Sequence, residues 1–190
     1  MSTLEDQLAA LEAEAERSPP GAAAHVMNRA GDVCLAAGLR ERALAFYGRG
    51  IDANLRGRRY DAAIGLCHKL LRVEPNAIRT RCTLAWLAIG RGDRAESVRE
   101  IGDYVAAAIG SGDGARAAKH LALMAEATDD AVVHELIVAQ LQRLGNPDAA
   151  EHVLRANADR PPTRASAIDA ERDVRWAKVV SGALTGPHEL

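Results

Sequence analysis

The chain has 190 residues, a formal net charge of −2 and 48% apolar residues. This length suffices for one domain or a short repeat array whose core needs neither disulfides nor a metal ion. The near-neutral charge lacks the basic excess of proteins that bind nucleic acids through phosphate groups, so we expect no nucleic-acid partner.

The composition also indicates the cellular setting and the type of secondary structure. No stretch approaches the roughly 20 apolar residues of a membrane span, and the acidic N-terminal segment differs from a signal peptide. We therefore expect a cytoplasmic protein without a membrane span. Alanine occurs 39 times and aromatic residues make up only 3%, which favours helices over sheets. Cys34, Cys67 and Cys82 form no CxxC pair and predict reduced thiols.

Glycine and proline divide the sequence into segments of helical length that are joined by short turns. The predicted helices span residues 3–17, 22–37, 39–55, 59–73, 77–91, 93–109, 115–127, 131–144, 147–158 and 167–183. None of these segments shows the alternation of apolar and polar residues that is typical of strands, so the predicted class is all-α. Turns of two to five residues predict that successive helices lie antiparallel.

Two segments share one spacing of small, apolar and proline residues. Ala63 precedes Pro75 by twelve positions, and Ala150 precedes Pro162 by the same number. In both segments the alanine stands where two helices would cross closely. Two further segments fit the same pattern through Gly31, Gly38, Ala43 and Tyr47, and through Leu84, Ala85, Gly92, Ser97, Ile101 and Tyr104.

On these residues the chain resembles the tetratricopeptide repeat family over roughly residues 22–164. The resemblance implies antiparallel helical hairpins, stacked as a short right-handed solenoid over residues 22–162 and flanked by terminal segments at 1–18 and 163–190.

The chain departs from the family pattern in three places. Ala43 and Ala63 are 20 residues apart instead of about 34, so the helix at 39–55 would serve two repeats. Ser97 and Ala150 are 53 apart, which leaves an extra helix around 115–127. The large aromatic residue early in each first helix is missing, and the residues in its place are Met27, Arg81 and His134.

The terminal helices have two alternative roles. The helix at 3–17, with Leu4, Leu8 and Leu11, and the helix at 167–183 would either cover the exposed ends of the array or dock onto a partner or a second copy. Three leucines at heptad-like spacing are too few to distinguish the two roles, so both remain open.

The resemblance implies a protein-interaction module whose first helices line a concave groove. Carried over to this sequence, the groove positions are His25, Asn28, Asp32, Arg79, Cys82, Trp86, Ile89, Glu135, Gln142 and Arg143. Trp86 with Arg79 would hold an apolar anchor and a carboxylate, although Trp86 could instead fill space between helices. Trp176 in the last predicted helix is a further candidate. We find no Lys, Arg and Asn clamp for a terminal carboxylate, which disfavours that partner.

Charge is distributed unevenly along the chain. Residues 51–100 contain ten basic and six acidic side chains, whereas residues 101–150 contain three and seven. Opposite charges on the two halves would favour head-to-tail self-association or an acidic partner on the basic half. The alternative is a solvated arginine-rich face without a partner.

The sequence predicts no catalytic, metal or cofactor site. Cys67 and His68 are neighbours on a helix and diverge, so they do not form a nucleophile and base pair. Three histidines on separate helices, His120, His134 and His152, lack zinc-ligand spacing. The glycine-rich residues 110–114 follow no strand and lack the lysine of a phosphate-binding loop. We therefore expect a protein that is not an enzyme.

Three functions remain as hypotheses. The first is a non-enzymatic adaptor or scaffold that binds a partner protein through the groove, the terminal helices or both. The second is a structural subunit of a larger assembly. The third is a regulatory module of a signalling or nucleic-acid-binding machine, because the array at 22–76 is similar to helical modules attached to bacterial signalling domains.

Overall fold

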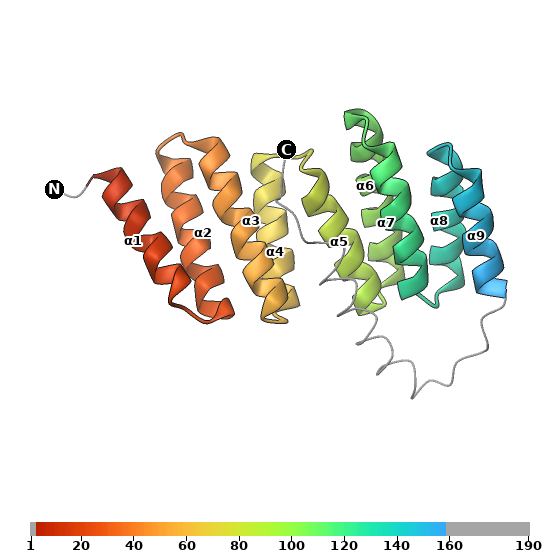
Figure 1. Ribbon diagram of the computed structural model, residues 1–190, viewed down its shortest axis with the longest axis horizontal. Helices are drawn as coiled ribbons and strands as arrows, with labels where there is room; N and C mark the ends of the chain where they lie inside the picture. Colours follow the sequence, from red (N-terminus) through yellow and green to blue (C-terminus); the bar gives the residue numbers. More distant parts are fainter. Residues whose placement is uncertain (1–2, 159–190) are drawn as a thin grey trace. The chain divides into compact units, whose positions relative to one another are not determined.

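The computed structural model describes residues 3–158, and this part of the chain consists of nine α-helices without a strand (Figure 1). The helices are α1 (Leu4–Glu16), α2 (Pro20–Ala36), α3 (Arg40–Arg56), α4 (Tyr60–Val73), α5 (Ile78–Arg91), α6 (Arg94–Ser111), α7 (Gly114–Ala127), α8 (Ala131–Arg143) and α9 (Pro147–Ala158). The predicted all-α class is confirmed. The helix predicted at 167–183 lies outside the described residues.

The described chain divides into two compact units, residues 3–80 and residues 81–158. The first unit contains α1 to α4 and the beginning of α5. In it α1 packs on α2, α2 on α3, and α3 on α4. In the second unit neighbouring helices from α6 to α9 pack on one another. None of the helices in the described part is long and apolar enough to cross a membrane.

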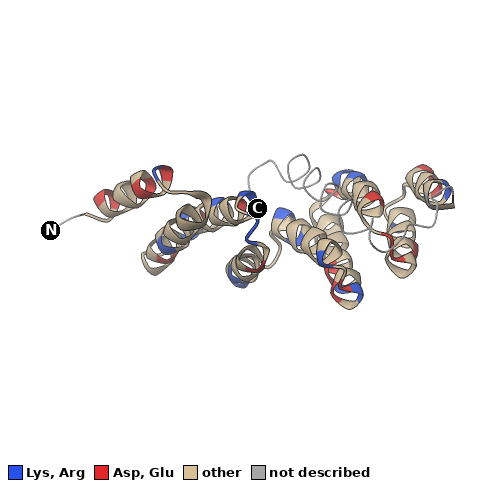
Figure 2. Cartoon of the chain, turned by 90° about the horizontal axis from the view of Figure 1, so that it is seen from below, with Lys and Arg blue, Asp and Glu red and all other residues tan. Residues whose placement is uncertain are grey.

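Helix α1 packs on α2 through an apolar stripe. Leu8, Leu11 and Ala15 are buried, and a capping box between Thr3 and Asp6 fixes the start of the helix. Acidic residues run along the rest of α1 (Figure 2). Two of them form ion pairs with α3: Glu5 Oε1 lies 2.6 Å from Arg42 Nη1, and Glu12 Oε1 lies 2.7 Å from Arg49 Nη1. Both pairs are exposed, so apolar burial contributes most of the stability of this contact.

Helix α3 contacts both α2 and α4. Small residues allow these close approaches. A methyl group at Gly31 of α2 would overlap the ring of Tyr47, and one at Gly50 would lie 2.7 Å from Leu66 Cδ2 of α4. Interdigitation of this kind holds α2 and α4 against the same central helix.

The turn between α3 and α4 has an unusual backbone. Helices α2 and α8 are each followed by a glycine with positive φ, but after α3 the left-handed position is occupied by Arg58 at φ 54°. This conformation is costly for a residue with a side chain. Arg58 N donates to Leu55 O at 3.0 Å, and Arg59 N donates to Asn54 O at 2.9 Å. The turn thereby fixes Arg59 beside the end of α3.

In the second unit, aspartate side chains cap the starts of α6 and α8. Asp93 accepts from Glu96 N at 3.0 Å, and Asp130 accepts from Val132 N at 2.9 Å. Asp130 Oδ2 also pairs with Arg94 Nε at 2.7 Å, which links the start of α6 to the start of α8.

Candidate functional site

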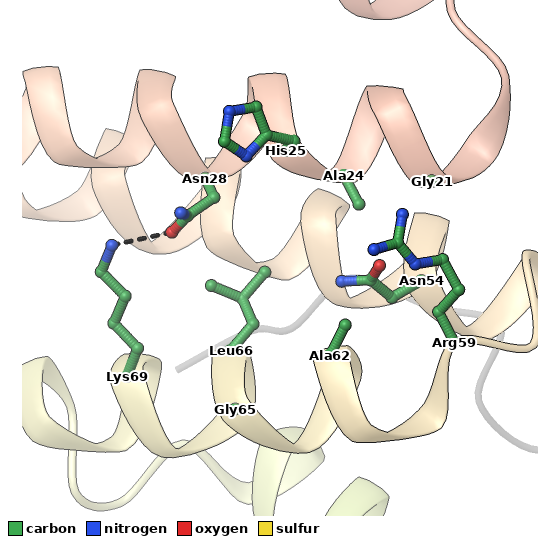
Figure 3. Close-up of a pocket in the computed structure, with 10 residues that line it drawn as sticks. All are labelled: Gly21, Ala24, His25, Asn28, Asn54, Arg59, Ala62, Gly65, Leu66 and Lys69. Carbon is green, nitrogen blue, oxygen red and sulfur yellow. Dashed lines mark hydrogen bonds between the residues drawn. The ribbon is translucent and has the colours of Figure 1, made fainter.

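The first unit contains a pocket of about 240 Å³ between α2 and α4. Its lining residues are Gly21, Ala24, His25 and Asn28 of α2, Asn54 of α3, Arg59 of the turn, and Ala62, Gly65, Leu66 and Lys69 of α4 (Figure 3). The two helices both pack on α3, and the small side chains on their facing sides leave the space between them open. We call this space the α2–α4 groove.

Arg59 lies at one end of the groove with its guanidinium directed toward Gly21 (Figure 3). A methyl group on Gly21 would overlap Arg59 Nη1, so glycine at this position allows the guanidinium to lie against α2. Within residues 3–158 the guanidinium makes no ion pair or hydrogen bond. Arg59 therefore brings an unpaired positive charge to the groove.

Asn54 lines the groove beside Arg59 and is 5% exposed. Its side-chain amide makes no hydrogen bond to any residue that the structure describes. A carboxamide offers two donors and an acceptor. In Asn54 these atoms are open to the pocket, because among the described residues only Trp86 Nε1 is a fully buried side-chain nitrogen or oxygen without a partner. A nearly buried amide that faces an open pocket without a protein partner is typical of a site that binds a ligand.

At the other end of the groove Lys69 is already paired. Lys69 Nζ donates to Asn28 Oδ1 at 2.7 Å and forms an ion pair with Asp32. Tyr47 Oη donates to Asp32 Oδ1 at 2.7 Å, and Lys69 Nζ lies 4.9 Å from the centroid of the Tyr47 ring. Lys69 is therefore electrically neutralised within its own unit.

This network also sets the ionisation of its members. Burial raises the pKa of Asp32, but the hydrogen bonds from Lys69 and Tyr47 and the Lys69 charge lower it more, so the pKa ends below its ordinary value. Burial, together with the hydrogen bond to Asp32, raises the pKa of Tyr47 far above its ordinary value. Asp32 stays ionised and Tyr47 stays protonated at neutral pH.

The structure brings some of the sequence-predicted groove residues together. His25 and Asn28 line the α2–α4 groove, and Asp32 holds Lys69 at its end. Sequence reasoning missed Asn54 and Lys69 as lining residues, and it treated Arg59 only as part of the basic half. It also found no set of Lys, Arg and Asn side chains that could hold a carboxylate, whereas one pocket gathers Asn28, Asn54, Arg59 and Lys69.

The predicted anchor at Trp86 and Arg79 is wrong for the folded chain. Trp86 is 0% exposed and Ile89 is also buried, so neither side chain is presented to a partner. Arg79 donates to Asp52 with two nitrogens, at 2.8 and 3.3 Å, and is largely buried. Trp86 instead fills space in the interior, which was the alternative interpretation of this residue.

The remaining predicted residues lie elsewhere. Gln142 and Arg143 are exposed at the end of α8 in the second unit. Trp176 lies outside the described residues.

Ion pairs account for much of the arginine-rich segment. Arg81 pairs with Asp103, Arg94 with Asp130, and Arg99 with Glu100. Much of the predicted basic half is thus neutralised inside the chain. Around the turn between α3 and α4, by contrast, Arg56, Arg58 and Arg59 are exposed and have no carboxylate partner among residues 3–158.

The second unit contains a polar cluster in its interior. Tyr104 Oη lies 2.8 Å from His120 Nδ1, a distance at which the hydroxyl donates to an unprotonated nitrogen, and Cys82 Sγ lies 3.4 Å from the same atom. Burial, with a smaller effect of Arg116, lowers the pKa of His120. Burial also raises the pKa of Tyr104. Cys82 is 1% exposed, so this cluster belongs to the core.

The lowered pKa of His120 predicts a stability that depends on pH. The unfolded chain binds a proton at the ordinary pKa of 6.5, above the pKa in the folded state. Unprotonated His120 therefore makes its full contribution to the free energy of unfolding above pH 6.5. This contribution is lost as the pH falls from 6.5 toward the pKa of His120 in the folded state. Urea unfolding at pH 7.5 and 5.5 should show a smaller pH effect in His120→Gln than in the wild type or in His68→Gln, a variant of an exposed histidine. Equal pH effects in all three proteins would contradict this assignment.

The other histidines are not arranged for metal binding. His134 Nε2 lies 2.8 Å from Ala125 O and Nδ1 lies 3.2 Å from Asp130 O, so the main chain occupies both nitrogens. Within residues 3–158 no group of three or more His, Cys, Asp or Glu side chains is placed to hold a metal ion. Comparisons with protein-family models and with curated proteins find no family and no curated protein that matches this chain.

Proposed function

We propose that the chain is a non-enzymatic adaptor or scaffold whose first unit binds an extended segment of a partner protein in the α2–α4 groove. The observation that carries this proposal is Asn54, a nearly buried amide that lines the groove without a hydrogen-bond partner among the described residues. Asn28 lines the same space. The Asn54 side chain offers both donors and an acceptor, and Asn28, whose Oδ1 accepts from Lys69, offers its NH2 group. These groups match the C=O and N–H groups of an extended main chain.

The size of the groove supports a peptide segment over a cofactor. Pockets for cofactors and drug-sized molecules usually enclose about 300–1,000 Å³, whereas this one has about 240 Å³. Gly21, Ala24, Ala62 and Gly65 present little side chain to it. One or two side chains of a bound segment fit such a space, while the rest of the segment runs between the helices.

The proposal includes the repeat architecture. We infer that the helices form hairpins of a short right-handed tetratricopeptide-like solenoid, with α3 shared between two hairpins. Support comes from the buried small residues Ala43, Ala63, Ala85 and Ala150, which the repeat pattern places where helices cross. A cytoplasmic location, as expected from the sequence, belongs to the same proposal.

Peptide selection tests the proposed function. Random peptides displayed on phage are selected on the immobilised full chain and measured on two variants. Ala62→Trp fills the groove, and Ala45→Trp adds the same bulk at an exposed position of α3 that does not line it. We expect peptides that bind the wild type and Ala45→Trp alike and bind Ala62→Trp at least tenfold more weakly. Failure to enrich any peptide, or equal binding to both variants, would overturn the proposal.

The structural-subunit hypothesis has separate support in the second unit. Its exposed large apolar side chains are Val98, Ile109, Leu123, Val132 and Leu154. Single exposed apolar residues are common on monomers, so this remains the second candidate. Replacing Val132 and Leu154 with serine should release the chain from its native complex if these residues form an assembly interface, and should have no effect if the groove is the binding site.

A further inference from the structure

We propose that the α2–α4 groove selects a segment with an acidic side chain, whose single carboxylate is held by Arg59 and Asn54. This inference rests on the proposed function and specifies the chemistry of the partner. A side chain and a free C-terminus both supply a carboxylate. We assign the bound carboxylate to an aspartate or glutamate side chain within the segment.

The charge of the groove points to a group with one negative charge. Lys69 is neutralised by Asp32, and its Nζ donates to Asn28. An arginine and a lysine, Arg59 and Lys69, line the groove, and of these Arg59 is the one without a carboxylate partner in the described chain. One uncompensated guanidinium in the lining matches one carboxylate, whereas a phosphate would bring a second negative charge, and the lysine of the lining, Lys69, is already paired with Asp32.

The geometry suits a planar anion. A guanidinium presents its N–H groups as a fork that matches the two oxygens of a carboxylate. Gly21 leaves room for the guanidinium against α2, and the hydrogen bond from Arg59 N to Asn54 O keeps the two residues adjacent. In the proposed complex the Asn54 side-chain amide, which lines the same pocket, donates to the same anion.

The groove also offers apolar side chains that the methylene groups of an acidic residue can contact. Ala62 and Leu66 lie between the Arg59 end and the Lys69 end of the groove (Figure 3). The methylene groups of glutamate or aspartate would pack there. A segment that runs past both the Arg59 end and the Lys69 end presents a side chain to the groove and not its terminus.

The surroundings favour acidic segments further. Arg56 and Arg58 are exposed beside Arg59 and have no carboxylate partner within residues 3–158. Three unpaired arginines in four positions attract acidic chains at a distance, and this attraction weakens with added salt.

Nuclear magnetic resonance titration of the ¹⁵N-labelled full chain tests the inference. The probe is an acetylated and amidated pentapeptide with one central glutamate among alanines. The comparison peptides carry glutamine at the centre or consist of alanine with a free C-terminus, and inorganic phosphate is the last probe. We expect the glutamate peptide to shift the Arg59 Nε–H and Asn54 amide signals and to bind roughly two- to fivefold more tightly than the glutamine peptide, as for an exposed ion pair.

Variants separate a site from general charge attraction. Arg59→Gln should abolish the preference for glutamate, while Arg29→Gln, which removes an exposed arginine of α2 that does not line the groove, should retain it. Gly21→Ala should weaken the preference by displacing the guanidinium without removing its charge. Circular dichroism checks that each variant is folded.

Several results would overturn the inference. The first is equal binding of the glutamate and glutamine peptides. The second is an equal loss of the preference for glutamate in Arg59→Gln and Arg29→Gln. The third is binding of phosphate, or of the peptide with a free C-terminus, that is as tight as binding of the glutamate peptide. The proposed function fails differently, because its failure would appear as selected peptides, whatever their charge, that bind Ala62→Trp as tightly as the wild type. Selected neutral peptides that respond to Ala62→Trp would leave the proposed function in place and remove the inference.

Discussion

Replacing Trp86 with alanine should lower the free energy of unfolding by about 3–5 kcal/mol, the usual range for a fully buried large aromatic residue. The side chain is 0% exposed, and every residue from 82 to 89 in α5 is buried. Removing the indole leaves a cavity in a helix that has no solvent-facing side over this stretch. Urea unfolding followed by circular dichroism measures the loss.

Trp86→Phe is the matched control for this prediction. The Trp86 Nε1 atom is buried and has no hydrogen-bond partner among the described residues, so phenylalanine removes an unsatisfied donor together with part of the apolar volume. Its loss should be smaller than that of the alanine variant by more than 1 kcal/mol. A loss below about 1 kcal/mol in Trp86→Ala would show that this residue is not part of the core.

The second large effect is expected at Gly31, where α2 meets α3. An alanine methyl group would lie 2.5 Å from Tyr47 Cδ1 and closer still to Cε1. Tyr47 is fully buried and its hydroxyl donates to Asp32, so the ring cannot move without disturbing the network that neutralises Lys69. Gly31→Ala should therefore cost about 1–3 kcal/mol, as overpacked cores do.

In the same unit, Gly65→Ala is expected to raise the free energy of unfolding instead of lowering it. No atom lies within 4 Å of a methyl group at Gly65, and alanine is favoured over glycine inside a helix by about 0.5–1 kcal/mol. Chemical denaturation should therefore show Gly31→Ala destabilised and Gly65→Ala stabilised. Stabilisation in both variants would mean that α2 and α3 do not approach as closely as described.

Helix positions were predictable from the sequence because glycine, proline and capping residues mark the ends. The largest differences between the predicted and the observed helix ends are two residues, and each has a local cause. Helix α2 begins at Pro20 instead of residue 22, because proline is tolerated in the first turn of a helix. Helix α6 continues to Ser111, and the left-handed Gly112 ends it.

The site was predictable only where it follows the repeat pattern. His25 and Asn28 were identified because they fall on the exposed side of a matched first helix. Arg59 and Asn54 were missed because the first belongs to a turn and the second to a helix that the pattern assigns to packing. An asparagine in a buried stretch is a signal that could have been used, since a buried amide needs a partner.

Trp86 was misplaced for a related reason. The resemblance to the repeat family assigned Trp86 to the groove side of a first helix, with Arg79 beside it, and that side was expected to face solvent or a partner. In the structure Arg79 pairs with Asp52, and Arg81 of the same helix pairs with Asp103, both from segments far away in the sequence. Pairing of this kind depends on tertiary packing and leaves no local pattern, so the sequence alone could not show that the helix is buried on all sides.

The most direct test of the central claim is photo-crosslinking from the α2–α4 groove in living cells. A photoreactive amino acid is placed at Gly65, where added side-chain atoms meet open space, or at the exposed Ala45 outside the groove. We predict a protein adduct of defined mass from position 65 and none from position 45, and loss of that adduct in Ala62→Trp. Equal adducts from both positions, or an adduct that persists in Ala62→Trp, would contradict binding in the groove.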